Sequence, residues 1–159
     1  MAVAAAGLLS ACSSVNFPGL AHIAPKPATR AAVAEASASR AVRPANLDAL
    51  IAKYALAYNV PEALIHRVIV RESGYNPKAR NGPYYGLMQI SYATAQSMGY
   101  RGAASGLLDA ETNLKYAVKY LSGAYVVGGG NADQAVRNYS RGYYYDAKRQ
   151  GLLEEVGLR

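Results

Sequence analysis

The residue best suited to chemistry in this chain is Glu72, a carboxylate on the apolar side of a predicted helix. Four apolar residues before it have the spacing of one buried helix face: Leu64, Ile65, Val68 and Ile69. Glu72 continues that spacing. Burial disfavours the charged form of a carboxyl group, and so does the carbonyl-rich end of a helix. Both effects raise the pKa of Glu72, as a general acid near neutral pH requires. The alternative is a glutamate that only pairs with Arg67 or Arg71.

Glu72 must be positioned by the helix that carries it, which we expect over residues 61–73. Pro61 suits the first helical position, and Gly74 is a natural stop. A preceding helix is expected over residues 46–58, with Asn46 as its N-cap. Residues 75–85 hold strong turn signals and are expected to form a loop. A short helix is predicted over residues 91–98, with Ser91 as its N-cap. A long helix is predicted from Asp109, its N-cap, to about Val127, where Gly128 ends it. A further helix is predicted to start at Asn131, with Gln134 completing a capping-box-like pattern.

Four stretches in order carry a resemblance to a known family. Glu72-Ser73 is followed by a Gly/Pro-rich loop and Gly86-Leu87-Met88-Gln89-Ile90, then by Asn113 with Tyr120-Leu121, and then by Asn138-Tyr139-Ser140-Arg141-Gly142. This order resembles the lytic transglycosylases of the soluble-lytic-transglycosylase (SLT) type, lysozyme-like enzymes that cut peptidoglycan. The resemblance covers about residues 47–145. It implies a mainly α, lysozyme-like helical domain of the goose-type lysozyme/SLT kind, with little or no sheet.

The resemblance also implies roles for individual residues. Glu72 is the implied catalytic residue. Gln89 is implied to hydrogen-bond sugar near the cleavage point, Met88 to line the glycan groove, and Tyr139 to point its hydroxyl at Glu72. The implied substrate-binding set is Ser73, Tyr85, Met88, Gln89, Asn113, Tyr139 and Ser140.

Three alternatives stay open at these positions. Met88 could pack in the core, and Gln89 could brace the loop. Tyr84, Tyr85 or both could line the cleft. The fourth motif also departs from the family's Ala-Tyr-Asn-x-Gly, because Asn138 replaces Ala and Ser140 replaces Asn. These changes bear on substrate contacts more than on the chemistry.

Only one well-placed acid is found, although glycoside cleavage usually uses two carboxylates. Asp109, Glu111 and Asp146 are the other candidates, and none sits in a matching motif. A single acid fits substrate-assisted chemistry. The resemblance implies that the product carries a 1,6-anhydro-muramic end, which makes the enzyme a lyase that needs no cofactor. The alternatives are a lysozyme-type hydrolase with the same cleft, a non-catalytic lipid-anchored peptidoglycan-binding protein, and a wall-remodelling enzyme that serves a larger machine.

The charge of the chain favours an anionic binding partner. The 159 residues include 17 basic and 10 acidic residues, for a net charge of +7. The basic residues form no run and no nucleic-acid motif is present, so we expect cell wall and anionic membrane rather than nucleic acid. The single cysteine allows no disulfide within the chain, and no metal signature is found. We expect a monomer that binds glycan strands.

The N-terminal part predicts export and attachment. Residues 1–11 are a short apolar run, and Leu9-Ser10-Ala11-Cys12 resembles a bacterial lipoprotein box, which implies lipidation of Cys12. No basic residue precedes Cys12, so an unlipidated apolar N-terminus with a chance cysteine is the alternative. Residues 12–45 are expected to form a flexible Ala/Pro/Ser-rich tether and residues 46–159 the catalytic domain. The expected location is the periplasmic face of the outer membrane, or the periplasm.

Overall fold

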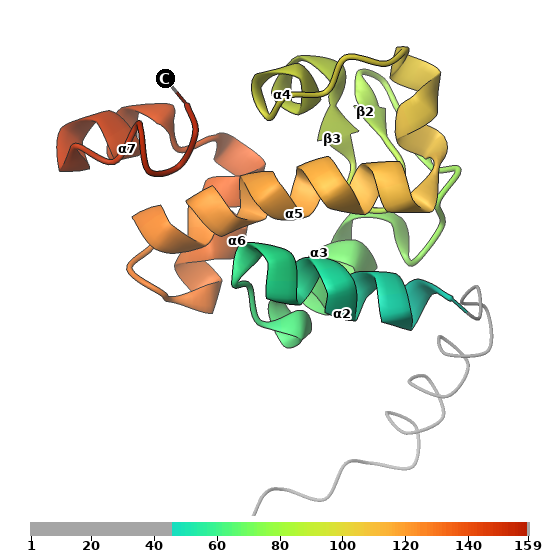
Figure 1. Ribbon diagram of the computed structural model, residues 1–159, viewed down its shortest axis with the longest axis horizontal. Coiled ribbons are helices and arrows are strands. Elements are labelled where there is room, and N and C mark those ends of the chain that lie inside the picture. The colour runs from blue at the N-terminus through green and yellow to red at the C-terminus, as the bar shows by residue number, and fades with distance from the viewer. Residues whose placement is uncertain (1–45, 159) are drawn as a thin grey trace, which may run out of the picture.

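The computed structural model describes residues 46–158, and this part of the chain is mainly helical (Figure 1). Its elements follow in the order α2 (Leu47–Tyr58), α3 (Glu62–Ser73), β1 (Arg80–Asn81), β2 (Tyr84–Tyr85), β3 (Ile90–Ser91), α4 (Tyr92–Ser97), the 3₁₀ helix η1 (Ala104–Leu108), α5 (Ala110–Val127), α6 (Ala132–Arg141) and α7 (Tyr144–Gln150). The mainly α class with little sheet, expected from the sequence, is confirmed.

The longest helix, α5, runs through the middle of the domain (Figure 1). It packs against α2, α6, α4 and η1. Its side of the core consists of small and branched residues that are fully buried: Leu114, Ala117, Val118, Leu121 and Ala124. The Asp109 side chain accepts the Thr112 N–H at its start, and Gly128 ends it, both as predicted.

The helix that carries Glu72, α3, ends where the sequence indicated, but the first residues of α2 and of α3 differ from expectation. Gly74 closes α3 in the left-handed conformation, with φ +57°. Pro61 is the N-cap rather than the first helical residue, since its ψ of 129° is extended. Asn46 precedes α2 with helical backbone angles, so its side chain makes no capping hydrogen bond.

Three two-residue strands lie within the stretch between α3 and α4. They form an antiparallel sheet in the order β1-β2-β3, with Asn81 opposite Tyr84 and Tyr85 opposite Ile90. Gly82 and Pro83 make the turn between the first two strands, where Gly82 has φ +57°. The sequence predicted only a loop over residues 75–85, so this hairpin is a correction. Strands of two residues are too short to show an alternating pattern.

The C-terminal helices complete the core. The Asn131 side chain caps α6 by accepting the Gln134 N–H, whereas the Gln134 side chain reaches forward to Asn138 and closes no capping box. Tyr143 is buried and donates its hydroxyl to the Tyr120 carbonyl, while Tyr144 and Tyr145 are exposed.

The predictions made for residues 1–45, including the signal-like segment, the tether and the lipidation of Cys12, lie outside the described residues. Within residues 46–158, no helix combines the length and the apolar character needed to span a membrane.

Candidate active site

Glu72 lines a hollow that lies between the end of α3, the small sheet and α6. The hollow is lined by Arg71, Glu72, Asn81, Tyr84, Gln89, Tyr139 and Ser140. A second hollow continues toward α4 and the end of α6, where Thr94, Arg141 and Gly142 line it. Tyr84, Gln89, Tyr139 and Ser140 line both hollows. The two therefore form one continuous depression, which we call the groove.

The environment of Glu72 favours the protonated form of its carboxyl group. Its side chain is 24% exposed, and burial raises its pKa above the ordinary value for a glutamate. The guanidinium of Arg71 opposes this rise, because its Nε lies 3.7 Å from Glu72 Oε1. Burial is the stronger of the two effects. Arg67 takes no part, since it pairs with Asp133 at 2.6 Å.

Three side chains from distant parts of the chain hold the backbone of Leu87 and Met88. The Ser73 hydroxyl donates to the Leu87 carbonyl at 2.6 Å, and the Asn113 Oδ1 accepts the Met88 N–H at 3.0 Å. Asn113 is fully buried and also donates Nδ2 to the carbonyls of Tyr85 and Leu107. The predicted sugar contact of Asn113 is therefore wrong. Neither Ser73 nor Asn113 lines the groove, and both hold the backbone that leads into Gln89 beside it.

Tyr139 is the third of these groups, and its hydroxyl has a different partner from the one expected. It donates to the Met88 carbonyl at 2.8 Å rather than to Glu72. The ring lines both hollows although Tyr139 is only 9% exposed. Burial, and after it the charge of nearby Glu72, raises the pKa of Tyr139 well above its ordinary value. Tyr139 is thus a neutral wall of the groove beside Glu72.

Met88 and Gln89 are the two residues of this motif that were expected to contact sugar, and only Gln89 lies at the groove. The Met88 side chain is fully buried in the core, so the prediction that it lines the groove is wrong and core packing is its role. Gln89 lines both hollows, and its Nε2 donates to the carbonyls of Ala79 and Gly86. Its amide therefore braces the loop and faces the groove, and its backbone has a positive φ of 47°.

Of the two tyrosines left open, Tyr84 lines the groove. It is 47% exposed, whereas Tyr85 points to the other face of β2, packs partly against the core and lies under the guanidinium of Arg80. Tyr85 does not line the groove, so its position does not support the predicted contact with substrate. Asn81 lines the groove and was missed, because Asn81-Gly82 signalled only a turn.

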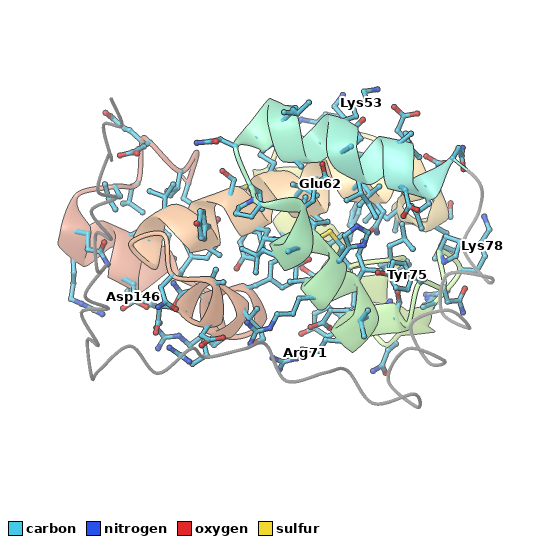
Figure 2. The ribbon with its side chains drawn as sticks, turned by 90° about the horizontal axis from the view of Figure 1, so that it is seen from below. Lys53, Glu62, Arg71, Tyr75, Lys78 and Asp146 are labelled. Carbon is cyan, nitrogen blue, oxygen red and sulfur yellow. The ribbon has the colours of Figure 1, made fainter. Side chains whose placement is uncertain are left out.

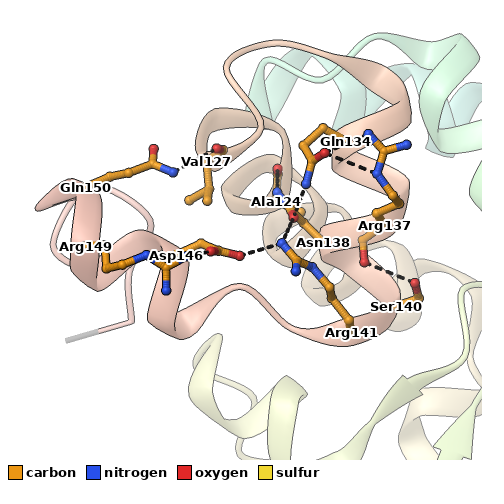
Figure 3. A network of polar contacts seen from close by, with 10 residues as sticks. All are labelled: Ala124, Val127, Gln134, Arg137, Asn138, Ser140, Arg141, Asp146, Arg149 and Gln150. Atoms are coloured by element: carbon orange, nitrogen blue, oxygen red, sulfur yellow. Dashed lines mark hydrogen bonds and ion pairs between the residues drawn. The ribbon is translucent and has the colours of Figure 1, made fainter.

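The altered fourth motif is accommodated by a polar network (Figure 3). Asn138 is buried, donates to the Ala124 carbonyl, and accepts from Gln134 and from Arg141. Arg141 also pairs with Asp146 at 2.6 Å. Ser140 lines both hollows, and its hydroxyl donates to carbonyls of its own helix.

Glu72 is the one carboxylate among the described residues that line the groove. The three other candidate acids have partners elsewhere. Asp109 caps α5, Glu111 accepts from Lys53 at 2.7 Å and from Tyr54, and Asp146 is held by Arg141 and Arg149. Over residues 46–158 no group of three or more metal-ligating side chains occurs.

The groove of this helical domain holds one half-buried carboxylate beside neutral hydrogen-bonding side chains and two arginines, Arg71 and Arg141. A concave site with convergent polar groups of this kind suits a polar ligand. The family model described as "Transglycosylase SLT domain" matches residues 49–152, and the chain therefore belongs to this family of peptidoglycan lytic transglycosylases. No solved structure matches the chain at a significant level.

Proposed function

We propose that the protein cleaves the β-1,4 bond between N-acetylmuramic acid and N-acetylglucosamine, with Glu72 as its single general acid and base. The observation that carries this proposal is the placement of Glu72. Its carboxyl group is half-buried, its pKa is raised by burial, and it shares the groove with no other described carboxylate.

The reaction then proceeds in two proton transfers. Protonated Glu72 gives its proton to the bridging oxygen as the bond from that oxygen to the muramic C1 breaks. The neighbouring acetamido group stabilises the positive charge that develops at C1. The Glu72 carboxylate next takes the proton of the muramic C6 hydroxyl as the O6–C1 bond forms, which restores the acid and leaves a 1,6-anhydro end. No water is consumed, so the reaction is that of a lyase.

The rest of the groove suits a sugar chain. Asn81, Gln89 and Ser140 carry neutral hydrogen-bonding groups, and Tyr84 adds an exposed ring. Sugars present hydroxyl and amide groups on one side and apolar C–H faces on the other. The groove therefore offers both kinds of contact along its length.

The test is digestion of purified peptidoglycan, followed by mass spectrometry of the released fragments. The wild-type protein is expected to release fragments about 18 Da lighter than hydrolysed ones, the mass of one water that is not added. Glu72→Gln is expected to release none, because an amide gives no proton to the leaving oxygen. Glu111→Gln removes an acid outside the groove and is expected to keep full activity.

Two results would replace the proposal. Fragments with ordinary reducing ends, lost in Glu72→Gln, would make the protein a lysozyme-type hydrolase. No fragments from any variant, with wall binding retained by both wild type and Glu72→Gln, would make it a binding protein.

A further inference from the structure

Arg71 combines three properties that the reaction proposed above leaves unused. It lines the hollow that holds Glu72, its side chain is 55% exposed, and its guanidinium makes no hydrogen bond with any described residue. Within residues 46–158, its one charged contact is the ion pair with Glu72 at 3.7 Å, longer than a hydrogen bond. Arg71 lies near the end of α3, close to the domain surface (Figure 2).

The geometry of this ion pair leaves most of the guanidinium available. The atom that approaches Glu72 is Nε, the nitrogen nearest to the chain. The two terminal amino groups lie further out on the side chain, and together they carry four N–H donors. Planar N–H pairs of this kind match the two oxygens of a carboxylate.

The ion pair must also weaken during the reaction. Glu72 acts first as a protonated acid, and in that state it carries no charge to attract Arg71. The remaining side chains of this hollow, Asn81, Tyr84, Gln89, Tyr139 and Ser140, are neutral. Arg71 is then a cation in the groove whose charge no described side chain of that hollow balances.

We propose that Arg71 binds a carboxylate of the substrate next to the bond that is cleaved, and so selects glycan strands with acidic substituents. This inference rests on the proposed function. Muramic acid carries a lactyl carboxylate, which is free in peptide-free strands and joined to a peptide in intact wall. The peptide brings carboxylates of its own, so both sources present the same chemistry to Arg71.

The chain offers a matched control in Arg67, one helical turn before Arg71 on α3. Its side chain is 51% exposed and it also pairs with a carboxylate, that of Asp133. Arg67 does not line the groove. Arg67→Gln and Arg71→Gln therefore make the same change in net charge on the same helix, and only one of them changes the groove.

The experiment measures kcat/KM and Kd of the full chain on three strands of equal length. The first is peptide-free with free lactyl carboxylates, the second is the same strand with these groups converted to methylamides, and the third carries intact peptides. The readout is the preference for each acidic strand over the methylamide strand. A ratio of this kind cancels any effect of Arg71 on the acidity of Glu72.

The wild-type protein is expected to prefer an acidic strand by about three- to tenfold, as for a charged hydrogen bond at a partly exposed site. Arg71→Gln is expected to remove most of this preference and to leave only the part that comes from the net charge of the chain, and Arg71→Lys is expected to keep more of it. Arg67→Gln is expected to keep the wild-type ratio. A preference for the peptide strand alone would assign the carboxylate to the peptide, and a preference for the free lactyl strand would assign it to the sugar.

Equal ratios in the wild type and Arg71→Gln would overturn the inference, as would an equal loss in Arg67→Gln, which would reveal a bulk charge effect. Thermal unfolding of each variant shows that its fold is kept. If the wild type cleaves none of the strands, the proposed function has failed, and the ratios of Kd still decide the role of Arg71.

Discussion

At the scale of the residue, Glu72 is subject to two opposing effects on its acidity. Burial at the end of an apolar helix face raises its pKa, and the neighbouring Arg71 guanidinium lowers it. The sequence predicted the first effect from spacing alone. Pairing with Arg71 stood only as the alternative to a general acid, because residues adjacent on a helix point about 100° apart and only the long arginine side chain brings the charges together.

These two effects predict how activity depends on pH. The general acid must be protonated, so kcat/KM is expected to fall as the pH rises through the raised pKa of Glu72. Arg71→Gln removes the cation that favours the ionised form, so this fall is expected at higher pH than in the wild type. Tyr139 has a raised pKa and stays neutral over this range.

Kinetics on the methylamide strand between pH 4 and 9 check this shift without a substrate carboxylate. Arg67→Gln serves as the control and is expected to keep the wild-type profile, since its guanidinium lies with Asp133. A profile for Arg71→Gln that is unchanged or moved to lower pH would contradict the account of Glu72.

At the scale of the element, short-range sequence signals predicted where most helices begin and end. Ser91, Asp109 and Asn131 each cap the helix they were expected to cap, because a cap depends on residues only three positions apart. The roles of Met88 and Asn113 were predicted wrongly. The motif indicates which residues belong to the site, but whether a side chain faces sugar or core depends on packing between distant elements.

The close approach of Gly86 to Asn113 predicts a large effect of one methyl group. Gly86 has φ +72°, and a Cβ there would lie 2.4 Å from both Asn113 Nδ2 and the Leu107 carbonyl oxygen. Gly86→Ala is expected to lower the free energy of unfolding by about 2–4 kcal/mol, through backbone strain and overpacking together. Urea unfolding measures this difference.

Gly82 provides the comparison within the same sheet. Its φ is +57°, but no atom lies within 4 Å of the position of a Cβ. Gly82→Ala therefore carries the strain alone, at about 1–2 kcal/mol. If Gly86→Ala and Gly82→Ala lowered the free energy of unfolding equally, Asn113 and Leu107 would have moved aside without any loss of stability.

At the scale of the whole molecule, the net charge of +7 acts on every encounter with an anionic wall. We expect kcat/KM on acidic strands to fall as NaCl rises from 0.05 to 0.5 M, because salt screens exposed charges over about 10 Å at 0.1 M and less above it. We expect kcat to change little, since the bound substrate has already been attracted. Methylamide strands should show a weaker dependence, and an equal dependence would place the effect in the protein rather than in its attraction to substrate.

The backbone that leads into Gln89 is fixed by side chains far away along the chain. Ser73, Asn113 and Tyr139 hold the backbone of residues 87 and 88 from α3, α5 and α6, across sequence separations of 14, 25 and 51 residues. During folding, such contacts form only after the intervening chain has been closed into loops, so they come late. We therefore expect the groove to be completed late in folding, so that a partly folded chain carries Glu72 without the groove around it.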